Sequence, residues 1–476
     1  MSEKFDVSAF SKNRFINKKA IMKSKKLKNI YSNRFAIYIF LIVTYIPFWV
    51  TVHSMSGDDT SMFRNVLEHQ NLWEYSLHRY LTWTSRNILE IVTVFFCNYF
   101  PFVLWKIINL AVYLILYHAL WSLFFDKEMK YGWLLAIGLQ FIPVKLFNET
   151  GVITIATTYM WPLTAGFLSL FPLKWHIQNR KMVWWLYPLF LAAFVYCGNM
   201  ELYLPAMLLG YTVYLGYCYK YHNLKSGLIW GYGLVLLLQI IYFELCPGNR
   251  LRAVSDHATE LLYQSGYLEK IYRGLTSVIL YCVGNYEFQF FFFMLLLMYA
   301  FLFFRRVNNM IERAVLVIMP CYSFLLSYIL YPLRWIGKLP GCLDYLFVTE
   351  WNGESGLFCM VALLLCLLPF VYLLYFPVKY GGDMEEDSSK TNYVVQWLCI
   401  LCPVVIGLLS RCALGLSPTI DIDLSRQSIL CYFGVLLTGL YLIKYYRDPS
   451  RNVQQIFVLF AILSWLRNIV MSFYYF

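Results

Sequence analysis

The chain has 476 residues and a net charge of +12, and 60% of its residues are hydrophobic while only 14% are charged. Soluble domains carry about 25% charged residues, so this composition excludes an ordinary water-soluble protein. Long apolar runs of roughly 20 residues match the hydrocarbon core of a bilayer, where only helices or closed barrels satisfy their backbone groups. The runs are too long and continuous for barrel strands, so the sequence predicts an all-α polytopic membrane bundle.

Positive charge is concentrated at the N-terminus. Ten of the 39 Lys and Arg residues precede the first apolar run, between Lys4 and Arg34. A basic segment in this position is typical of a cytoplasmic end and is suited to anionic lipid, so we expect membrane lipids and no nucleic acid as partners. Residues 1–34 are predicted to form a cytoplasmic tail. No repeat or linker divides residues 35–476, which we assign to one domain.

In chain order, the apolar runs predict about thirteen transmembrane helices. They cover residues 35–52, 101–125, 131–147, 153–173, 183–198, 202–219, 227–246, 275–304, 314–333, 356–376, 393–409, 429–443 and 453–473. Polar residues interrupt the third and fourth runs, and the first half of 275–304 is polar enough to project beyond the bilayer. Short basic turns follow the even-numbered spans, which predicts an N-terminus inside and a C-terminus outside.

Residues 53–100 form the first predicted outer loop. Apolar residues recur in it at spacings of three and four, which predicts helices lying along the membrane surface. The loop opens with Ser56-Gly57-Asp58-Asp59, two adjacent carboxylates near the membrane. A carboxylate there could act as a general base toward a hydroxyl. The alternative interpretation is a turn in which an aspartate caps the next helix.

A second polar element follows the span 227–246. Pro247 and Gly248 end the helix, and Asn249, Arg250 and Arg252 come directly after them. Arginine forms bidentate bonds to phosphate and keeps its charge when partly buried, so this element is a candidate phosphate site. The alternative is a solvated turn or a lipid contact made by snorkelling arginines.

Two further turns carry charge on the same predicted face. Glu201 follows the fifth span, where an ionisable residue is a functional candidate by default; a helix cap or an internal salt bridge is the alternative. The last outer loop holds Asp421, Asp423 and Arg426. The spacing of the two aspartates is typical of metal-binding nucleotide-sugar enzymes, but the predicted topology places them on the face without nucleotide sugars. We therefore favour Arg426 as a cation for phosphate, with an aspartate orienting it or capping the next helix.

Arg86 in the first loop, and Tyr159 and Trp161 at the start of the fourth span, are weaker candidates. The two aromatic residues fit an interfacial belt as well as a sugar-stacking surface. Asn148 begins an Asn-Glu-Thr glycosylation sequon, which has meaning only in a eukaryotic secretory compartment. Most of the thirteen cysteines lie inside apolar runs and fit small core residues.

The order of these motifs resembles a known family. The motifs are the Asp58-Asp59 pair, Ser85-Arg86, Tyr159-Met160-Trp161-Pro162, Gly198 to Glu201, Pro247-Gly248-Asn249 with its arginines, and Ser425-Arg426. They resemble a large group of bacterial multi-pass proteins described as glucosyltransferase-like, which is similar to the GT-C class of lipid-dependent glycosyltransferases. The resemblance extends over about residues 35–446, and it is carried by the order and shared side of short motifs. Arginine stands at both Arg250 and Arg252, so which of them meets phosphate stays open.

The resemblance implies a GT-C-like transferase in a bacterial cytoplasmic membrane. It would move a sugar, with inversion, from a polyprenyl-phosphate donor to a cell-envelope glycan or lipid acceptor at the outer face. The implied roles are catalytic carboxylates at Asp58, Asp59 and Glu201, phosphate or donor binding by Arg250, Arg252, Arg426, Arg86 and Asn249, and sugar contact by Tyr159 and Trp161. No cofactor is required, although a divalent metal at Asp58 and Asp59 is an alternative. The rival classes are a transporter or flippase, a polymerase of lipid-linked glycans, and a non-catalytic scaffold.

Overall fold

The computed structural model describes most of the chain. The described residues are 33–147, 150–180, 183–221, 227–255, 267–338, 356–380, 390–414, 425–445 and 450–475. Within these ranges every regular element is a helix, as the composition predicts. Residues 1–32 of the predicted tail, Asn148 and Glu149 of the sequon, and Asp421 and Asp423 lie outside the described residues.

Seven helical segments of the described chain are long and apolar enough to cross a membrane. They are α2 (Arg34–Thr51), α5 (Phe102–Phe125), α12 (Gly227–Leu245), α16 (Tyr286–Phe303), the segment Met310–Arg334, the segment Arg426–Tyr445 that contains α22 (Ile429–Tyr445), and most of α23 (Ser450–Tyr475). The segment Met310–Arg334 consists of α17 (Met310–Leu325), η6 (Leu326–Leu330) and most of α18 (Tyr331–Trp335). The chain is therefore a helical membrane protein. The count of thirteen spans stays a prediction.

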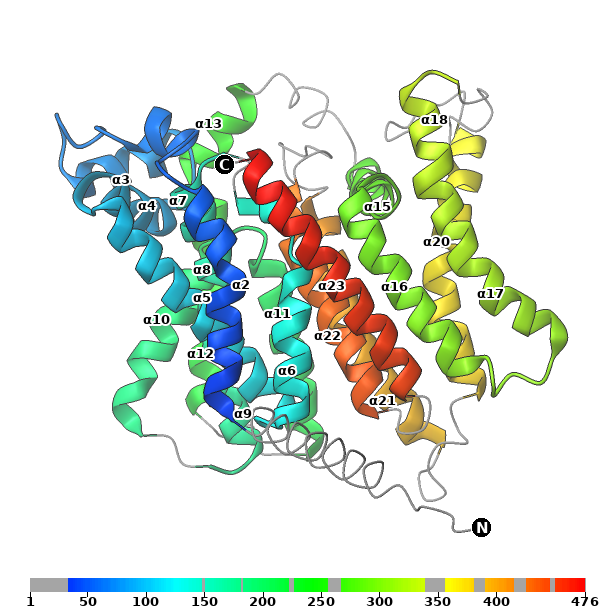
Figure 1. Ribbon diagram of the computed structural model, residues 1–476. Helices are drawn as coiled ribbons and strands as arrows, with labels where there is room; N and C mark the ends of the chain where they lie inside the picture. Colours follow the sequence, from blue (N-terminus) through cyan, green and yellow to red (C-terminus); the bar gives the residue numbers. More distant parts are fainter. Residues whose placement is uncertain are drawn as a thin grey trace, which may run out of the picture.

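The centre of the bundle is formed by α16 and α22. Most of their residues are buried, whereas fewer than a third of the residues of α2, α12 and α23 are buried. Four further long helices belong to the bundle: α10 (Tyr187–Gly198), α11 (Leu204–Tyr221), α20 (Gly356–Tyr380) and α21 (Lys390–Ala413). Helix α21 packs along α22, and α10 along α8 (Trp161–Ser169). Figure 1 shows these helices side by side, with α2 and α23 crossing the front of the bundle.

The third predicted span is not a continuous helix. Helix α6 (Met129–Gly138) ends in the short turns η2 (Leu139–Phe141) and η3 (Val144–Phe147), because Pro143 has no backbone N–H to continue it. The carbonyls freed at this break accept from Asn468 of α23, whose Nδ2 lies 2.8 Å from Gln140 O and 2.9 Å from Ile142 O. The chain then resumes as α7 (Val152–Ile155), η4 (Ala156–Met160) and α8, with a π turn between the two α-helical parts.

The predicted span 275–304 is wrong as one helix. The structure has two helices in this region, α15 (Tyr267–Gly284) and α16, separated by Asn285. Asn285 is extended, and its side chain accepts from Phe288 N at 2.9 Å, so it caps the start of α16. Figure 1 shows α15 at the head of α16. The predicted span is therefore broken at a capped turn, and the projection of its first half beyond the bilayer stays a prediction.

The first outer loop contains the predicted surface helices. After the π turn η1 (Asp59–Phe63) come α3 (Leu72–Thr82) and α4 (Asn87–Tyr99). They lie beside the end of α2, at the end of the bundle that we call the α3 end (Figure 1). Trp73, Leu77 and Leu81 stand at i, i+4 and i+8 on α3 and are exposed. Such an apolar stripe is typical of a helix in the membrane interface.

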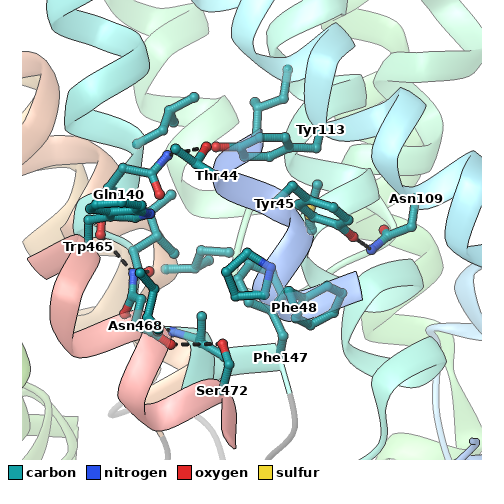
Figure 2. Close-up of a pocket in the computed structure, with 18 of the residues that line it drawn as sticks. Thr44, Tyr45, Phe48, Asn109, Tyr113, Gln140, Phe147, Trp465, Asn468 and Ser472 are labelled. Carbon is teal, nitrogen blue, oxygen red and sulfur yellow. Dashed lines mark hydrogen bonds between the residues drawn. The ribbon is translucent and has the colours of Figure 1, made fainter. Parts of the chain in front are cut away.

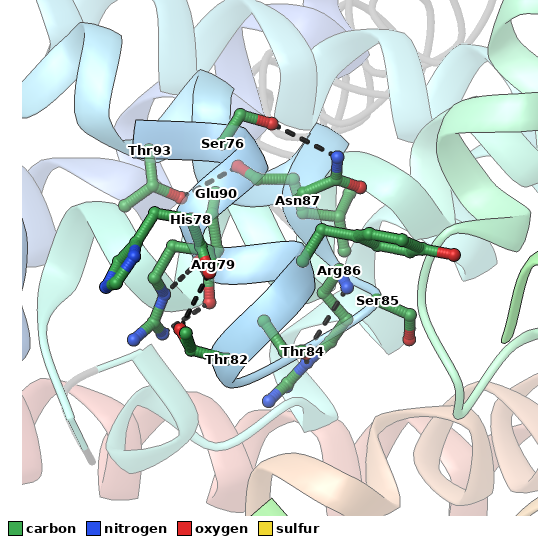
Figure 3. Close-up of polar contacts among 12 residues, drawn as sticks. Ser76, His78, Arg79, Thr82, Thr84, Ser85, Arg86, Asn87, Glu90 and Thr93 are labelled. Atoms are coloured by element: carbon green, nitrogen blue, oxygen red, sulfur yellow. Dashed lines mark hydrogen bonds and ion pairs between the residues drawn. The ribbon is translucent and has the colours of Figure 1, made fainter. Parts of the chain in front are cut away.

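A buried ion pair joins α3 to α4. Arg79 donates from Nε to Glu90 Oε2 at 2.6 Å and from Nη2 to Glu90 Oε1 at 2.8 Å, as Figure 3 shows. Glu90 is only 5% exposed. A bidentate pair fixes both the distance and the orientation of the two helices, so the loop is a rigid unit and not a flexible connection.

Removing one member of this pair is predicted to destabilise the loop. Arg79→Met leaves the Glu90 carboxylate buried without its partner, which typically costs about 3–5 kcal/mol. Thermal unfolding of the purified protein in detergent is expected to move to lower temperature. Arg64→Met, which changes an exposed arginine of the same loop, is expected to have little effect. Equal stability of the two variants would show that the ion pair does not hold the loop.

Candidate functional site

The turn Ser85-Arg86 is held by two asparagines from distant parts of the chain. Asn199, after α10, accepts from Ile88 N at 3.1 Å and donates to Ser85 O at 3.0 Å. Asn249, after α12, accepts from Ser85 N at 3.1 Å and donates to Ser85 Oγ at 3.0 Å. The first backbone N–H groups of a helix have no partner inside the helix, so Asn199 serves as the cap of α4. Both amides bring their turns against the first outer loop.

Arg86 projects from this turn into a cluster with Glu201 and Tyr159. Burial opposes the charge of Arg86, but the Glu201 carboxylate, and then Tyr159 and Glu90, more than offset it and raise the pKa of Arg86 above its ordinary value. A side-chain hydrogen bond joins Arg86 to Tyr159. Arg86 Nε also donates to Thr84 Oγ1 at 3.3 Å, seen in Figure 3. The structure thus gathers three predicted site residues from three separate loops and helices.

Asp59 caps a helix that begins far along the chain. Its Oδ1 accepts from Thr154 N at 2.8 Å and from Thr154 Oγ1 at 2.6 Å, and its Oδ2 accepts from Ile153 N at 3.0 Å. These groups belong to the N-terminus of α7, where a negative charge is also favoured by the helix dipole. Burial raises the pKa of Asp59, while these hydrogen bonds lower it. The capping interpretation therefore holds for Asp59, although the capped helix is not the next one.

Gly57 permits this close docking. Its φ of +51° favours glycine, and an added Cβ would lie 2.2 Å from Thr150 O. The N–H of Asp58 donates to the same carbonyl. Both oxygens of Asp59 already accept hydrogen bonds from α7. The divalent metal at Asp58 and Asp59 stays an alternative.

Asp58 lies beside Arg426, which comes from the opposite end of the chain. Asp58 is half-buried, and burial raises its pKa above the ordinary value. Arg426 acts against this rise and the neighbouring Asp59 adds to it. Arg426 belongs to η10 (Ser425–Ser428), which packs against η3 and precedes α22. The segment that holds Asp58 therefore lies near η10, although the two are far apart in the chain.

The Pro247-Gly248-Asn249 element is docked onto α3. It opens α13 (Pro247–Ser255), which packs on α3. An added Cβ at Gly248 would lie 2.4 Å from Trp83 N, so only glycine allows this approach. Helix α13 is consequently fixed to the first outer loop by backbone contact as well as by Asn249.

The two arginines of α13 have different surroundings. The Arg252 guanidinium lies 5.5 Å from the ring centroid of Trp83, and the Arg79 guanidinium lies at the same distance from that ring. Arg250 is exposed, and its Nη2 donates to Glu244 O at 3.3 Å. Arg252 is therefore the one of the pair that faces the first outer loop.

Tyr159 and Trp161 contact different neighbours. Trp161 donates from Nε1 to Asn109 Oδ1 at 2.8 Å and contacts Phe96 edge to face, with ring centroids 5.0 Å apart. It therefore packs against α5 and α4, whereas Tyr159 bonds to Arg86. Of the two predicted aromatic contacts, only Tyr159 joins the charged cluster.

Sequence reasoning missed the positioning residue Asn199. The two asparagines that hold the Ser85-Arg86 turn each follow a glycine, as Gly198-Asn199 and Gly248-Asn249. This repeated dipeptide at two turns on the same face is the signal that could have indicated a shared role.

An apolar crevice of about 420 Å³ runs between α8, α10 and α11 on one side and α21 and α22 on the other. Leu163, Met207 and Phe433 are among the residues that line it. Tyr203 also lines it and donates from its hydroxyl to Tyr159 O at 2.7 Å. The crevice therefore reaches η4, the helix segment that carries Tyr159, a partner of Arg86.

A second cavity, of about 70 Å³, lies between α2, α5 and α23 (Figure 2). Its polar groups bond to one another: Gln140 Nε2 donates to Thr44 Oγ1 at 3.0 Å, and Asn109 Nδ2 donates to Tyr45 Oη at 2.8 Å. Drug-sized ligands occupy pockets of about 300–1,000 Å³, so this cavity is an internal packing feature and not a substrate site.

The different roles of the adjacent aspartates are open to a stability test. Asp59→Ala removes three hydrogen bonds from buried groups of α7, and each group left unsatisfied costs about 1–3 kcal/mol. We expect a clear fall in the thermal unfolding temperature of the purified protein. Asp58→Ala, one residue away and half-buried, is the matched control and is expected to unfold near the wild-type temperature. A lower unfolding temperature for Asp58→Ala than for Asp59→Ala would contradict the capping role of Asp59.

Comparison with known proteins finds no match. No protein-family model, no curated protein and no solved structure matches the chain. The family resemblance therefore stays a hypothesis based on motif order, and roles for the site residues have to be argued from geometry.

Proposed function

We propose that the chain is a membrane glycosyltransferase. It moves a sugar from a polyprenyl-phosphate donor to a glycan or lipid acceptor of the bacterial cell envelope, at the α3 end of the bundle. The observation that carries the proposal is the meeting of Asp58 from the first outer loop with Arg426 from the last. A base and a phosphate-binding cation are the two groups that such a transfer needs most.

Asp58 is the better candidate for the base. The oxygens of Asp59 are committed to Ile153 and Thr154, whereas Asp58 is half-buried and has a raised pKa. A base gains strength as its pKa rises toward the working pH. Asp59 then supports the reaction by fixing the backbone that carries Asp58.

The chemistry follows from these two charges. Asp58 takes the proton of the acceptor hydroxyl, and the acceptor oxygen attacks the anomeric carbon on the face opposite the phosphate. The bond between the anomeric carbon and the phosphate oxygen breaks, and its electron pair leaves with the polyprenyl phosphate. Arg426 stabilises the negative charge that grows on the leaving group, an effect that is large in a site with little water. The sugar is transferred with inversion.

The apolar crevice supports a lipid-linked donor. Burying each CH₂ of an isoprenoid tail contributes about 0.8 kcal/mol, and the crevice offers a mostly apolar lining beside the Arg86 cluster. The bond from Tyr203 to Tyr159 O links the crevice wall to that cluster. Arg86 and Glu201 are assigned a positioning role, because each offsets the other's charge.

Asp58→Asn is predicted to abolish transfer while leaving the fold intact. A general base typically contributes about 10²–10⁴ in rate, so the expected loss is of that order. The assay is transfer of sugar from polyprenyl-phosphate hexoses by the purified chain in nanodiscs. Asp126→Asn, which changes an aspartate at the end of α5, is the control. Normal transfer by Asp58→Asn would exclude this base, and lipid translocation without any transfer by the wild type would favour a flippase.

The pH dependence gives a second test. Transfer requires ionised Asp58, so its rate should rise with pH along an acid limb whose midpoint lies above the ordinary aspartate value of 3.8. Arg426 lowers the pKa of Asp58. Arg426→Gln is therefore expected to move the limb to higher pH, in addition to reducing the rate. A limb that stays in place or moves to lower pH would show that the two residues do not interact.

A further inference from the structure

A third cavity, of about 1010 Å³, is formed by residues that the proposed function does not use. It lies between the start of α16, the run η6–α18, and α23, with η3 at its edge. The break at Asn285 helps to form it, because Gly284, Asn285, Tyr286 and Glu287 all line it. The head of α16, α18 and the end of α23 lie at the same end of the bundle as α3 (Figure 1). Its volume is at the upper limit of about 300–1,000 Å³ for ligand pockets.

Tyrosine rings supply much of the cavity wall. Tyr286 lies with its ring centroid 5.9 Å from that of Tyr328 and 6.3 Å from that of Tyr331. The Tyr328 hydroxyl donates to Tyr286 O at 3.2 Å, which joins η6 to the head of α16. A tyrosine offers a rigid apolar face together with a polar edge. Three such rings at one site suit a ligand with both C–H faces and hydroxyl groups.

Polar donors and acceptors face the same space. Glu287 and Lys145 line the cavity, as do Ser464 and Arg467 of α23. Ser464 is 1% exposed, and its Oγ has no hydrogen-bond partner among the described residues. Arg467 Nη2 donates to Phe141 O at 3.2 Å, while its buried Nε makes no bond within the described chain. The cavity wall therefore combines two cations and a carboxylate with the tyrosine rings.

The cavity is near the Asp58–Arg426 pair. Lys145 belongs to η3, and η10, which carries Arg426, packs against η3. Thr150, whose carbonyl accepts from the N–H of Asp58, comes five positions after Lys145 in the chain. A chain of that length spans at most about 18 Å. A ligand of several rings in this cavity could therefore present one end to the pair.

We propose that this cavity binds a saccharide, and that the saccharide is the acceptor glycan. The role of this saccharide as the acceptor rests on the proposed transferase function, whereas saccharide binding does not. The tyrosine rings stack on the C–H faces of the sugar rings, and Glu287, Arg467 and Lys145 bond to their hydroxyl groups. A lipid tail fits the apolar crevice and not a wall that carries two cations and a carboxylate.

The test is retention of sugar by the full chain in nanodiscs. The probe is an equimolar mixture of neutral and acidic di-, tri- and tetrasaccharides, and retained sugars are identified by mass spectrometry. Wild type is expected to retain at least one saccharide. Tyr331→Ala and Tyr286→Ala are each expected to reduce retention by up to about tenfold, as the loss of one aromatic contact predicts. Tyr219→Ala, which removes a tyrosine that is 81% exposed on α11, is expected to retain as much as wild type.

The outcomes separate the two proposals. Absence of retained sugar in the wild type, or equal retention by the Tyr286 and Tyr331 variants and the Tyr219 control, would overturn the saccharide site. Asp58→Asn should lose transfer and keep retention. If the wild type retains sugar in a Tyr331-dependent way but transfers none, the saccharide site stands and the transferase proposal fails. If it transfers sugar with no dependence on Tyr286 or Tyr331, the transferase stands and this site fails.

Discussion

The structure depends on side chains that satisfy backbone groups at four of its helix breaks. In a membrane there is no water to bond to a free N–H or carbonyl group, so each break needs a polar partner. Asp59 supplies it for α7, Asn199 for α4 and Asn285 for α16. Asn468 supplies it for the carbonyls at the end of α6. These four residues make interruptions tolerable in a chain that is otherwise a bundle of apolar helices.

The same breaks provide the chemistry. The cap at α7 fixes the backbone of Asp58, and the cap at α4 fixes the turn that presents Arg86 to Glu201 and Tyr159. The break at Asn285 contributes to the tyrosine-lined cavity. A continuous helix in any of these places would bury its side chains against neighbours or expose them to lipid. The groups that the proposed function uses are therefore presented where the helices stop.

Local pattern was enough to predict the helical membrane class and the helices of the first outer loop. The composition and the length of the apolar runs indicate a helical membrane protein. The spacing of Trp73, Leu77 and Leu81 indicates the surface helices of the first loop. The break at Asn285 could not be predicted, because a single asparagine in an apolar run also occurs inside helices. The partner of Asp59 lies in a helix that begins more than ninety positions later in the chain, so no local pattern distinguishes it from Asp58. Tyr159 and Trp161 likewise differ only in the direction in which each points.

The central claim is that Asp58 and Arg426 face one substrate. An electron cryomicroscopy structure of the full chain in nanodiscs with a bound polyprenyl-phosphate sugar tests it most directly. The phosphate is expected within hydrogen-bond distance of the Arg426 guanidinium, with the tail in the crevice beside Tyr203 and the anomeric carbon facing Asp58. A phosphate bound instead at exposed Arg250, with no contact to Arg426 and the sugar turned away from Asp58, would contradict the claim.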